Sequence, residues 1–365
     1  MRFTKILALA FMLALAGAVL AGSLASSLKA GKADLKSAGP LAFGPDGILF
    51  VGDSMGGAIF ALDTGDNAKA KSAAKVEIKG INEKVAALLG TTPDQLLLND
   101  MAVNPVSRNV YLSVSRGKGP DAAAVIVRAD AAGKLQEVSL DNIPHSKVSI
   151  PNAPNAASTD RRGMNMRMES ITDLAYVDGK VLVAGLSNEE FSSKLRAIPF
   201  PFAQADNGTS VEIFHGAHGR FETNAPVRTF MPYTINSEAH ILAAYTCTPL
   251  VTFKMSELKP GNKVMGTTIA ELGNRNRPSD MILYKKAGAN FILMNNSSRG
   301  VMKLSADGLE KFKGITAQTD VTGVPYETIA HLKGVQQLDS FDASHALALV
   351  SQESGAWDLV AIPLP

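Results

Sequence analysis

The chain repeats one plan six times: a short apolar strand, a turn rich in Gly, Asp, Asn or Pro, a second strand, a longer polar loop and a third strand. The first copy reads "PLAFGPDGILFVGDSMGGAIFALDTGD" from Pro40, and the last reads "VQQLDSFDASHALALVSQESGAWDLVAIPL" from Val335. First strands begin at intervals of roughly 53 to 73 residues, which suits four-stranded blades that carry insertions. The repeat therefore predicts an all-β fold, a six-bladed β-propeller, over residues 38–365.

Fourth strands can be assigned in four of the units from short alternating segments. These are "KVEIKG" at 75, "LQEVSL" at 135, "SVEIF" at 210 and "GTTIAEL" at 266. The last unit runs out of chain before a fourth strand. We expect the N-terminal segment 22–37, which contains "KADLKS", to supply that strand and close the ring, because closure removes exposed sheet edges.

Two segments interrupt the repeat. In residues 81–90 the apolar side chains fall at helical spacing, so we expect one short helical insertion there. Residues 145–170, "HSKVSIPNAPNAASTDRRGMNMRMES", are polar and without period. They predict a long loop, and loops of this length in compact domains are often functional.

The N-terminus has the pattern of a secretory signal peptide over residues 1–21. Arg2 and Lys5 precede an apolar run from Ile6 to Leu20, and small residues follow, so we expect cleavage near Ala21. The run is short for a membrane span, and no later segment is apolar for long enough to be one. The sequence predicts an exported protein, periplasmic or extracellular, without a membrane span.

Charge and cysteine content restrict the classes of molecule that we expect the protein to bind and the cross-links that it can form. The chain has 36 Lys and Arg and 34 Asp and Glu, and loss of Arg2 and Lys5 with the signal peptide leaves 34 of each. A neutral domain without basic clusters disfavours nucleic acid as a partner. Cys247 is the only cysteine, so an internal disulfide is impossible. We expect a monomer that binds a small polar molecule or a protein.

One face of the predicted ring gathers the residues with binding chemistry. The turns between first and second strands, such as "GPDG" and "VDGK", are ordinary turn sequences and indicate a structural face. On the opposite face the inner strands start with polar pairs, and an aspartate occurs in three of the six units. A divalent ion, calcium or magnesium, is the expected cofactor of this ring, with the ligands Asn99, Asp100, Asp173 and Asp280. The alternative is that each aspartate caps its blade by accepting backbone amides.

A second candidate metal site lies in the fourth unit and the crossover before it. His215, His218 and Cys247 offer imidazole and thiol ligands, which suit copper or zinc. The H-x-x-H spacing matches no strong motif, so hydrogen-bonding loop histidines and a buried inert thiol stay open as the alternative.

Other polar residues on this face are candidates for ligand binding. They are Glu222, Arg275, Asn276 and Arg277. A guanidinium group can clamp a carboxylate or phosphate through two parallel hydrogen bonds. Alternatively, the two arginines pair with Asp280, Asp173 or Glu169. The segment "GDSMGG", residues 52–57, is similar to a serine-protease nucleophile segment, but no matching His and Asp segments accompany it.

The start of the first unit, "F-x-P-D-G-x-L-x-V" over residues 43–51, and the strand rhythm resemble six-bladed propellers of the NHL-repeat and SMP-30/gluconolactonase-like group. The resemblance implies a divalent ion at the channel mouth, held by Glu, Asn and Asp, that polarises a lactone or ester carbonyl. Its counterparts here are Asn99, Asp100, Asp173 and Asp280. The first unit begins Gly39-Pro40-Leu41 where such enzymes place a glutamate, so Glu169 is the candidate substitute.

Three functions follow from these patterns. The first is metal-assisted hydrolysis of an ester or lactone, with Glu169, His215 and His218 as catalytic candidates. The second is a binding scaffold without catalysis that docks a protein or an envelope component. The third is a copper- or zinc-handling or redox protein that uses His215, His218 and Cys247.

Overall fold

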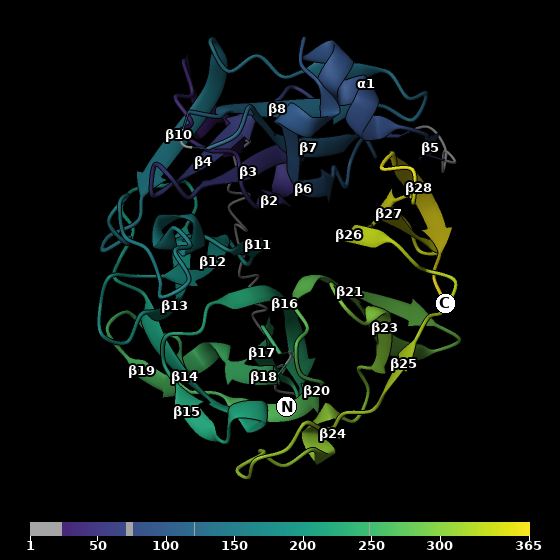
Figure 1. Ribbon diagram of the computed structural model, residues 1–365. Coiled ribbons are helices and arrows are strands. Elements are labelled where there is room, and N and C mark those ends of the chain that lie inside the picture. The colour runs from purple at the N-terminus through teal and green to yellow at the C-terminus, as the bar shows by residue number, and fades with distance from the viewer. Residues whose placement is uncertain (1–23, 71–75, 120, 248) are drawn as a thin grey trace, which may run out of the picture.

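The computed structural model describes residues 24–70, 76–119, 121–247 and 249–365. Six sheets, antiparallel except for one short parallel pairing, stand in a ring around a central channel, so the protein is an all-β, six-bladed propeller (Figure 1). One α-helix, α1 (Ile81–Leu88), occurs in this part of the chain, at the predicted insertion. No helix in the described ranges is long and apolar enough to cross a bilayer. The predicted signal peptide, residues 1–21, lies outside the described residues.

Each blade has four main strands, of which the first lines the channel and the fourth lies at the rim. The inner strands are β2 (Leu41–Phe43), β6 (Leu96–Val103), β11 (Asp173–Val177), β16 (Val227–Ile235), β21 (Pro278–Lys286) and β26 (Val335–Ser340). The second strands are β3 (Ile48–Asp53), β7 (Val110–Arg116), β12 (Lys180–Leu186), β17 (Glu238–Tyr245), β22 (Ala289–Asn296) and β27 (His345–Ser351). The third strands are β4 (Ala58–Asp63), β8 (Ala123–Ala129), β13 (Ser193–Pro199), β18 (Pro249–Lys254), β23 (Gly300–Ser305) and β28 (Trp357–Pro363).

The rim strands complete the sheets. In the same blade order they are β10 (Ile143–Ser149), β9 (Leu135–Glu137), β14 (Thr209–His215), β20 (Thr267–Leu272), β25 (Tyr326–Thr328) and β5 (Glu77–Ile78). Four short strands extend three of the sheets further: β1 (Lys29–Gly31), β15 (Arg220–Glu222), β19 (Lys263–Met265) and β24 (Val321–Gly323).

The blades do not follow one another around the ring in chain order. Inner strand β6 lies between β26 and β2, and β2 lies between β6 and β11 (Figure 1). The second unit of the chain is therefore inserted between the last blade and the first. After that unit the chain returns through β10, which forms the rim of the first blade beside β4.

The apolar core confirms this order, because each of its six clusters joins two neighbouring blades. Phe50 of the first blade packs with Val183 of the third, whereas Leu49 of the first blade packs with Tyr111 of the second. The cluster between the second blade and the last contains Leu112 and Leu347. These side chains are fully buried, so the junctions between blades are dry and densely packed.

Two of the strand assignments made from sequence are wrong. The segment at 75 is not the rim of the first blade: its strand β5 pairs with β28, where Ile78 faces Leu359, and completes the last blade. The N-terminal segment 22–37 does not close the ring, because its strand β1 pairs with β10 at the rim of the first blade. Burial explains why β5 joins the last blade, since Val76 and Ile78 pack in the apolar cluster between the last blade and the second. The assignments at 135, 210 and 266 are confirmed as β9, β14 and β20.

Helix α1 follows β5 directly and packs on β28 and β9. Ile81 and Val85 are fully buried, as the spacing of the apolar residues predicted, while Leu88 is 41 % exposed. The carboxylate of Asp358 accepts the backbone N–H of Gly80 at 2.9 Å, just before the first turn. The helix therefore packs at the junction between the last blade and the second.

Candidate functional site

The predicted aspartates lie in the wall of the central channel. Asp100, Asp173 and Asp280 border a cavity of about 370 Å³, together with a fourth carboxyl, that of Asp339. Sequence reasoning missed Asp339. The available sequence signal was an aspartate in an inner strand. Asp339 lies one residue before the end of β26, whereas the sequence analysis considered only the polar pairs at the strand starts.

Each of the four carboxylates joins its inner strand to that of the neighbouring blade. The Oδ2 atoms of Asp100, Asp173, Asp280 and Asp339 accept backbone N–H groups at 2.6, 2.8, 3.0 and 2.7 Å. The donors are, in the same order, Leu41, Phe230, Leu338 and Val103. The capping role that the sequence left open is thus present at four of the six junctions.

The narrow channel also shifts the ionisation of these groups. Burial raises the pKa of Asp173 to about 7, that of Asp280 to about 8 and that of Asp339 to about 6. Burial, followed by the charge of Asp280, raises the pKa of Asp100 well above its usual value. The amide of Asn99 donates to the carbonyl of Ala38 at 2.8 Å. Calcium or magnesium binding by this ring stays a prediction.

The histidine loop is built by a tight reversal of the chain at the rim of the third blade. His215 ends β14, His218 ends the 3-10 turn Gly216–His218, and Glu222 ends β15, which pairs back on β14. This reversal brings one carboxylate within reach of both imidazoles. Cys247 approaches from the loop between β17 and β18 with a left-handed backbone, φ 65°.

The carboxylate of Glu222 contacts the Nδ1 atom of each of the two imidazole rings. Its Oε2 lies 2.9 Å from Nδ1 of His215, and its Oε1 lies 2.7 Å from Nδ1 of His218. Burial alone would raise the pKa of Glu222, but hydrogen bonds from His215, His218 and Arg220 outweigh it and lower the pKa to about 2. An ionised carboxylate only accepts, so both Nδ1 atoms donate, and in the neutral form of each ring Nε2 keeps a free lone pair.

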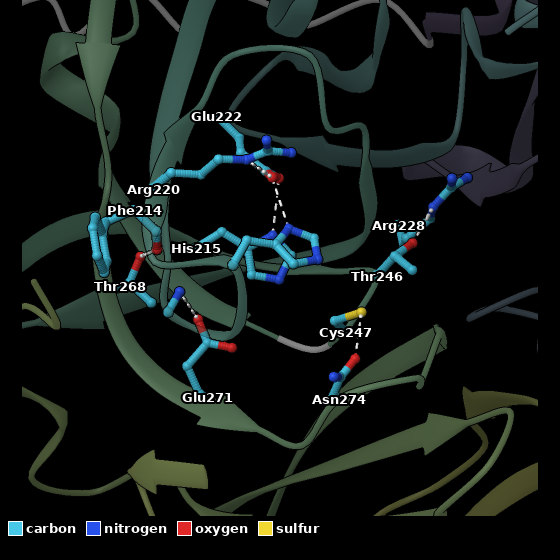
Figure 2. Close-up of polar contacts among 12 residues, drawn as sticks. Phe214, His215, Arg220, Glu222, Arg228, Thr246, Cys247, Thr268, Glu271 and Asn274 are labelled. Atoms are coloured by element: carbon cyan, nitrogen blue, oxygen red, sulfur yellow. Dashed lines mark hydrogen bonds and ion pairs between the residues drawn. The ribbon is translucent and has the colours of Figure 1, made fainter. Parts of the chain in front are cut away.

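Both histidines and Cys247 meet as one potential ligand set. One ligand atom from each of the three lies within 4.8 Å of the others, and in the described part of the chain no other group of three or more His, Cys, Asp or Glu side chains does this (Figure 2). Nε2 of His215 is buried and has no hydrogen-bond partner in the described structure. Two imidazoles and a thiol, oriented by a carboxylate behind them, fit copper or zinc.

Two neighbouring contacts position the loops that carry these ligands. The backbone N–H of Cys247 donates to the carbonyl of Asn276 at 2.6 Å, and its thiol donates to Oδ1 of Asn274 at 3.3 Å. Below the histidine turn, Oε1 of Glu271 accepts the N–H of Gly216 at 2.6 Å (Figure 2). Burial raises the pKa of Glu271 to about 7. No local pattern marks Glu271, which lies 55 residues from the turn it supports.

Glu169, a predicted catalytic residue, lies outside the histidine cluster. Its carboxylate forms an ion pair with Arg228. Nε of Arg228 also donates to Oγ1 of Thr246 at 3.1 Å, next to Cys247 (Figure 2). Both side chains of the pair are largely buried, at 22 % and 13 % exposed. Glu169 therefore connects the long loop after β10 to the loop that carries the thiol.

The predicted ligand-binding residues 275–277 lie beside this loop. Asn276 is buried, and its Oδ1 accepts the N–H of Ser298 at 3.1 Å. Arg275 is exposed, and its backbone lies in the left-handed region with φ 58°. The pairing of Arg275 or Arg277 with Glu169 was an open alternative, but Arg228 takes that position instead. A role in ligand binding stays a prediction for residues 275–277.

No family model matches the chain, and no curated protein matches it. Among solved structures it is similar to a Thermus thermophilus protein assigned as a glucose dehydrogenase, at 14 % identity and a TM-score of 0.35, over 92 % of this chain and 99 % of that one. It is also similar to the PQQ-bound aldose sugar dehydrogenase of Streptomyces coelicolor, at 12 % identity, a TM-score of 0.35 and coverage of 92 % and 96 %. A third match is the plexin A4 extracellular region, at 9 % identity and a TM-score of 0.38, over 92 % of this chain and 47 % of that one.

Proposed function

We propose that this chain is an exported metalloprotein that binds one copper or zinc ion through His215, His218 and Cys247. The observation that carries the proposal is the convergence of the three ligand atoms within 4.8 Å, with Glu222 bound to Nδ1 of both imidazoles. Metal-binding histidines almost always donate their other ring N–H to such a partner. Carboxylate orientation and free Nε2 atoms are what a transition metal requires of a preformed site.

Three protein ligands leave a coordination position for an exogenous molecule. The side chain of His218 is 41 % exposed, whereas that of His215 is 3 % exposed, so the site is open on one side. Copper with two imidazoles and one thiolate would serve electron transfer or copper handling. Zinc in the same place would activate a bound water for hydrolysis of an ester or lactone.

The channel aspartates support a metal less well than the histidine loop does. Their Oδ2 atoms already accept backbone amides from the neighbouring blades. We therefore assign them to joining blades. A relationship to the NHL-repeat and SMP-30/gluconolactonase-like group stays a proposal, supported by the "F-x-P-D-G-x-L-x-V" stretch that forms the end of β2, its turn and β3.

Metal content of the purified protein tests the proposal. The wild type, exposed in turn to Cu²⁺ and Zn²⁺ and then desalted, should retain about one ion per chain by elemental mass spectrometry. Cys247→Ser should retain much less, and the thiolate-to-copper absorption band of the Cu²⁺ form should be absent from it. His240→Gln is the matched control, because Nδ1 of His240 contacts the carbonyl of Glu238, away from the ligand set.

Retention of neither metal by the wild type would overturn the metalloprotein proposal and leave the scaffold function in its place. Retention of zinc but not copper would direct the next assay to esters and lactones, whereas retention of copper with the absorption band would direct it to redox titration.

A further inference from the structure

A strap of five residues, 316–320, contacts both of the loops that carry the histidines and the thiol. It comes directly before β24, and none of its five side chains is buried. Both ends of the strap are fixed to β20 and the residues beside it: the N–H of Ile315 donates to the carbonyl of Thr268 at 2.8 Å, and Val321 of β24 pairs with Leu272. Because the strap adds nothing to an apolar core, its polar contacts decide where it lies.

The strap contacts the histidine turn in two places. The N–H of Thr319 donates at 3.0 Å to the carbonyl of Gly216, which lies between the two histidines. A Cβ atom added to Gly219, whose φ is 64°, would lie 3.1 Å from Cβ of Gln318. The strap therefore packs closely on the turn, and a side chain at 219 would press the two apart.

The last residue of the strap holds the loop that positions the thiol. Oδ1 of Asp320 accepts the backbone N–H of Asn274 at 3.0 Å. Two residues further on, the carbonyl of Asn276 accepts the N–H of Cys247 at 2.6 Å. Cys247 has a left-handed backbone, φ 65°, which is uncommon for residues other than Gly, Asn or Asp and persists only where the surroundings fix it. Asp320 thus supports, through one short loop, the backbone conformation of the thiol ligand.

We propose that the strap is a positioning element of the metal centre, in which Thr319 and Asp320 fix the separation between the histidine turn and the thiol. Neither residue belongs to the ligand set. The inference rests on the function proposed above, because it concerns the same three ligands.

Metal binding and docking of the strap should favour each other. A metal bound to both loops stabilises the arrangement in which the strap contacts both of them, and such coupling is reciprocal. Binding of the thiol as a thiolate removes its S–H donor to Asn274 (Figure 2). The backbone contacts from Asn274 to Asp320 and from Cys247 to Asn276 do not depend on that proton.

The reactivity of the thiol tests the strap without any metal. Cys247 is the only cysteine, so the reaction of the metal-free protein with a chromogenic aromatic disulfide reports this one site. Asp320→Ala should react about fivefold faster than the wild type, as loss of one hydrogen bond that restrains the thiol loop would give. Asp320→Asn keeps an acceptor oxygen and should restore a rate close to that of the wild type. Asp307→Ala is the matched control, because Oδ2 of Asp307 also accepts a backbone N–H, that of Asn290, at 2.9 Å.

Metal binding gives a second measurement. In competition with a chelator, Asp320→Ala should bind copper or zinc about tenfold more weakly than the wild type, with a shifted thiolate-to-copper absorption band. In the wild type, metal loading should slow amide hydrogen exchange in the peptide that contains residues 315–320, measured by mass spectrometry.

An unchanged thiol reaction rate in folded Asp320→Ala would overturn the positioning role. If that variant does not fold, equal exchange of the strap in the metal-free and metal-loaded wild type would overturn it instead. A faster thiol reaction in Asp320→Ala, together with a wild type that retains neither copper nor zinc, would uphold the hold of the strap on the thiol loop and overturn the metal centre. The failure of one proposal is thereby distinguished from the failure of the other.

Discussion

Oε2 of Glu222 lies 2.9 Å from Nδ1 of His215, and both side chains are almost completely buried, at 8 % and 3 % exposed. A buried pair of this kind leaves the imidazole one orientation and one tautomer, with Nε2 free. The other oxygen of Glu222 does the same for His218 at 2.7 Å. One carboxylate therefore prepares two metal ligands.

Replacement of this carboxylate should weaken metal binding without removing a ligand. Glu222→Gln offers one acceptor oxygen in place of two and lacks the negative charge, so one ring loses its orientation. We expect the affinity for copper or zinc to fall by about 10- to 100-fold. Competition with a chelator of known affinity measures the change. Glu238→Gln, at the exposed end of the next blade's second strand, is the control. Equal affinities for the wild type and Glu222→Gln would show that the carboxylate does not support a metal site.

The channel carboxyls should make the protein less stable as the pH rises. The pKa values of Asp173 and Asp280 in the folded protein are about 7 and 8, well above the usual value for aspartate in an unfolded chain. Between about pH 4 and pH 8 the folded state therefore holds more protons, so the free energy of unfolding falls as they are released. The stability that protonation provides is complete at acid pH and lost above the folded pKa values.

Asp173→Asn and Asp280→Asn test this assignment. Each keeps an acceptor oxygen for the backbone amide and removes the buried charge. We expect the gain in free energy of unfolding of each variant over the wild type to be larger at pH 8 than at pH 5, by on the order of 1 kcal/mol. Urea unfolding at both pH values gives the comparison. A variant that is less stable at pH 8, with the deficit present only when calcium or magnesium is added to the wild type, would instead place a cation in the channel.

The ion pair between Glu169 and Arg228 should be structural. Glu169→Gln leaves a largely buried guanidinium group without its charged partner, so we expect a loss of about 1–3 kcal/mol in free energy of unfolding. Metal retention should change little, because neither residue supplies a ligand atom. Thermal and urea unfolding measure the first effect, and elemental analysis the second. Full stability with abolished hydrolysis of an ester substrate would restore Glu169 to the catalytic role that the sequence suggested.

Loss of apolar burial in the closing strand should loosen the ring. Ile78→Ala removes a side chain that is 3 % exposed and packed between the last blade and the second. We expect a cost of about 2–4 kcal/mol in free energy of unfolding. Glu77→Gln, an exposed position on the same strand, is the control and should stay near wild type. A cost below about 0.5 kcal/mol for Ile78→Ala would show that β5 contributes little to closure.

The sequence was enough to predict a propeller of six blades, but not the order of the blades around the ring. Alternation and turn residues identify strands locally, and they assigned β9, β14 and β20 correctly. They carry no information on which sheet edge a strand joins, so the two-residue strand β5 was placed in the wrong blade. Length is the physical reason: a rim strand this short is selected by the burial of Ile78 in a cluster of distant residues, not by its own pattern.

Only part of the candidate site could be predicted, because a sequence pattern reports residues that are close along the chain and not those brought together by packing. His215, His218 and Glu222 are close in sequence, so their proximity could be expected, whereas the approach of Cys247 depends on how the third and fourth blades pack. Arg228 and Glu271 act through contacts with residues far along the chain, and no local pattern marks them.

The pairing of β5 with β28 sets an order of events during synthesis. Ile78 leaves the ribosome long before its partner Leu359 is made. Until then β5 and α1 have no last blade to join, and the side of the second blade that will face it is uncovered. Sealing of this propeller therefore waits until β28 has been made, and a chain that stops short of β28 should be recognised by chaperones and proteases as unfinished even though most of its sheets are already formed.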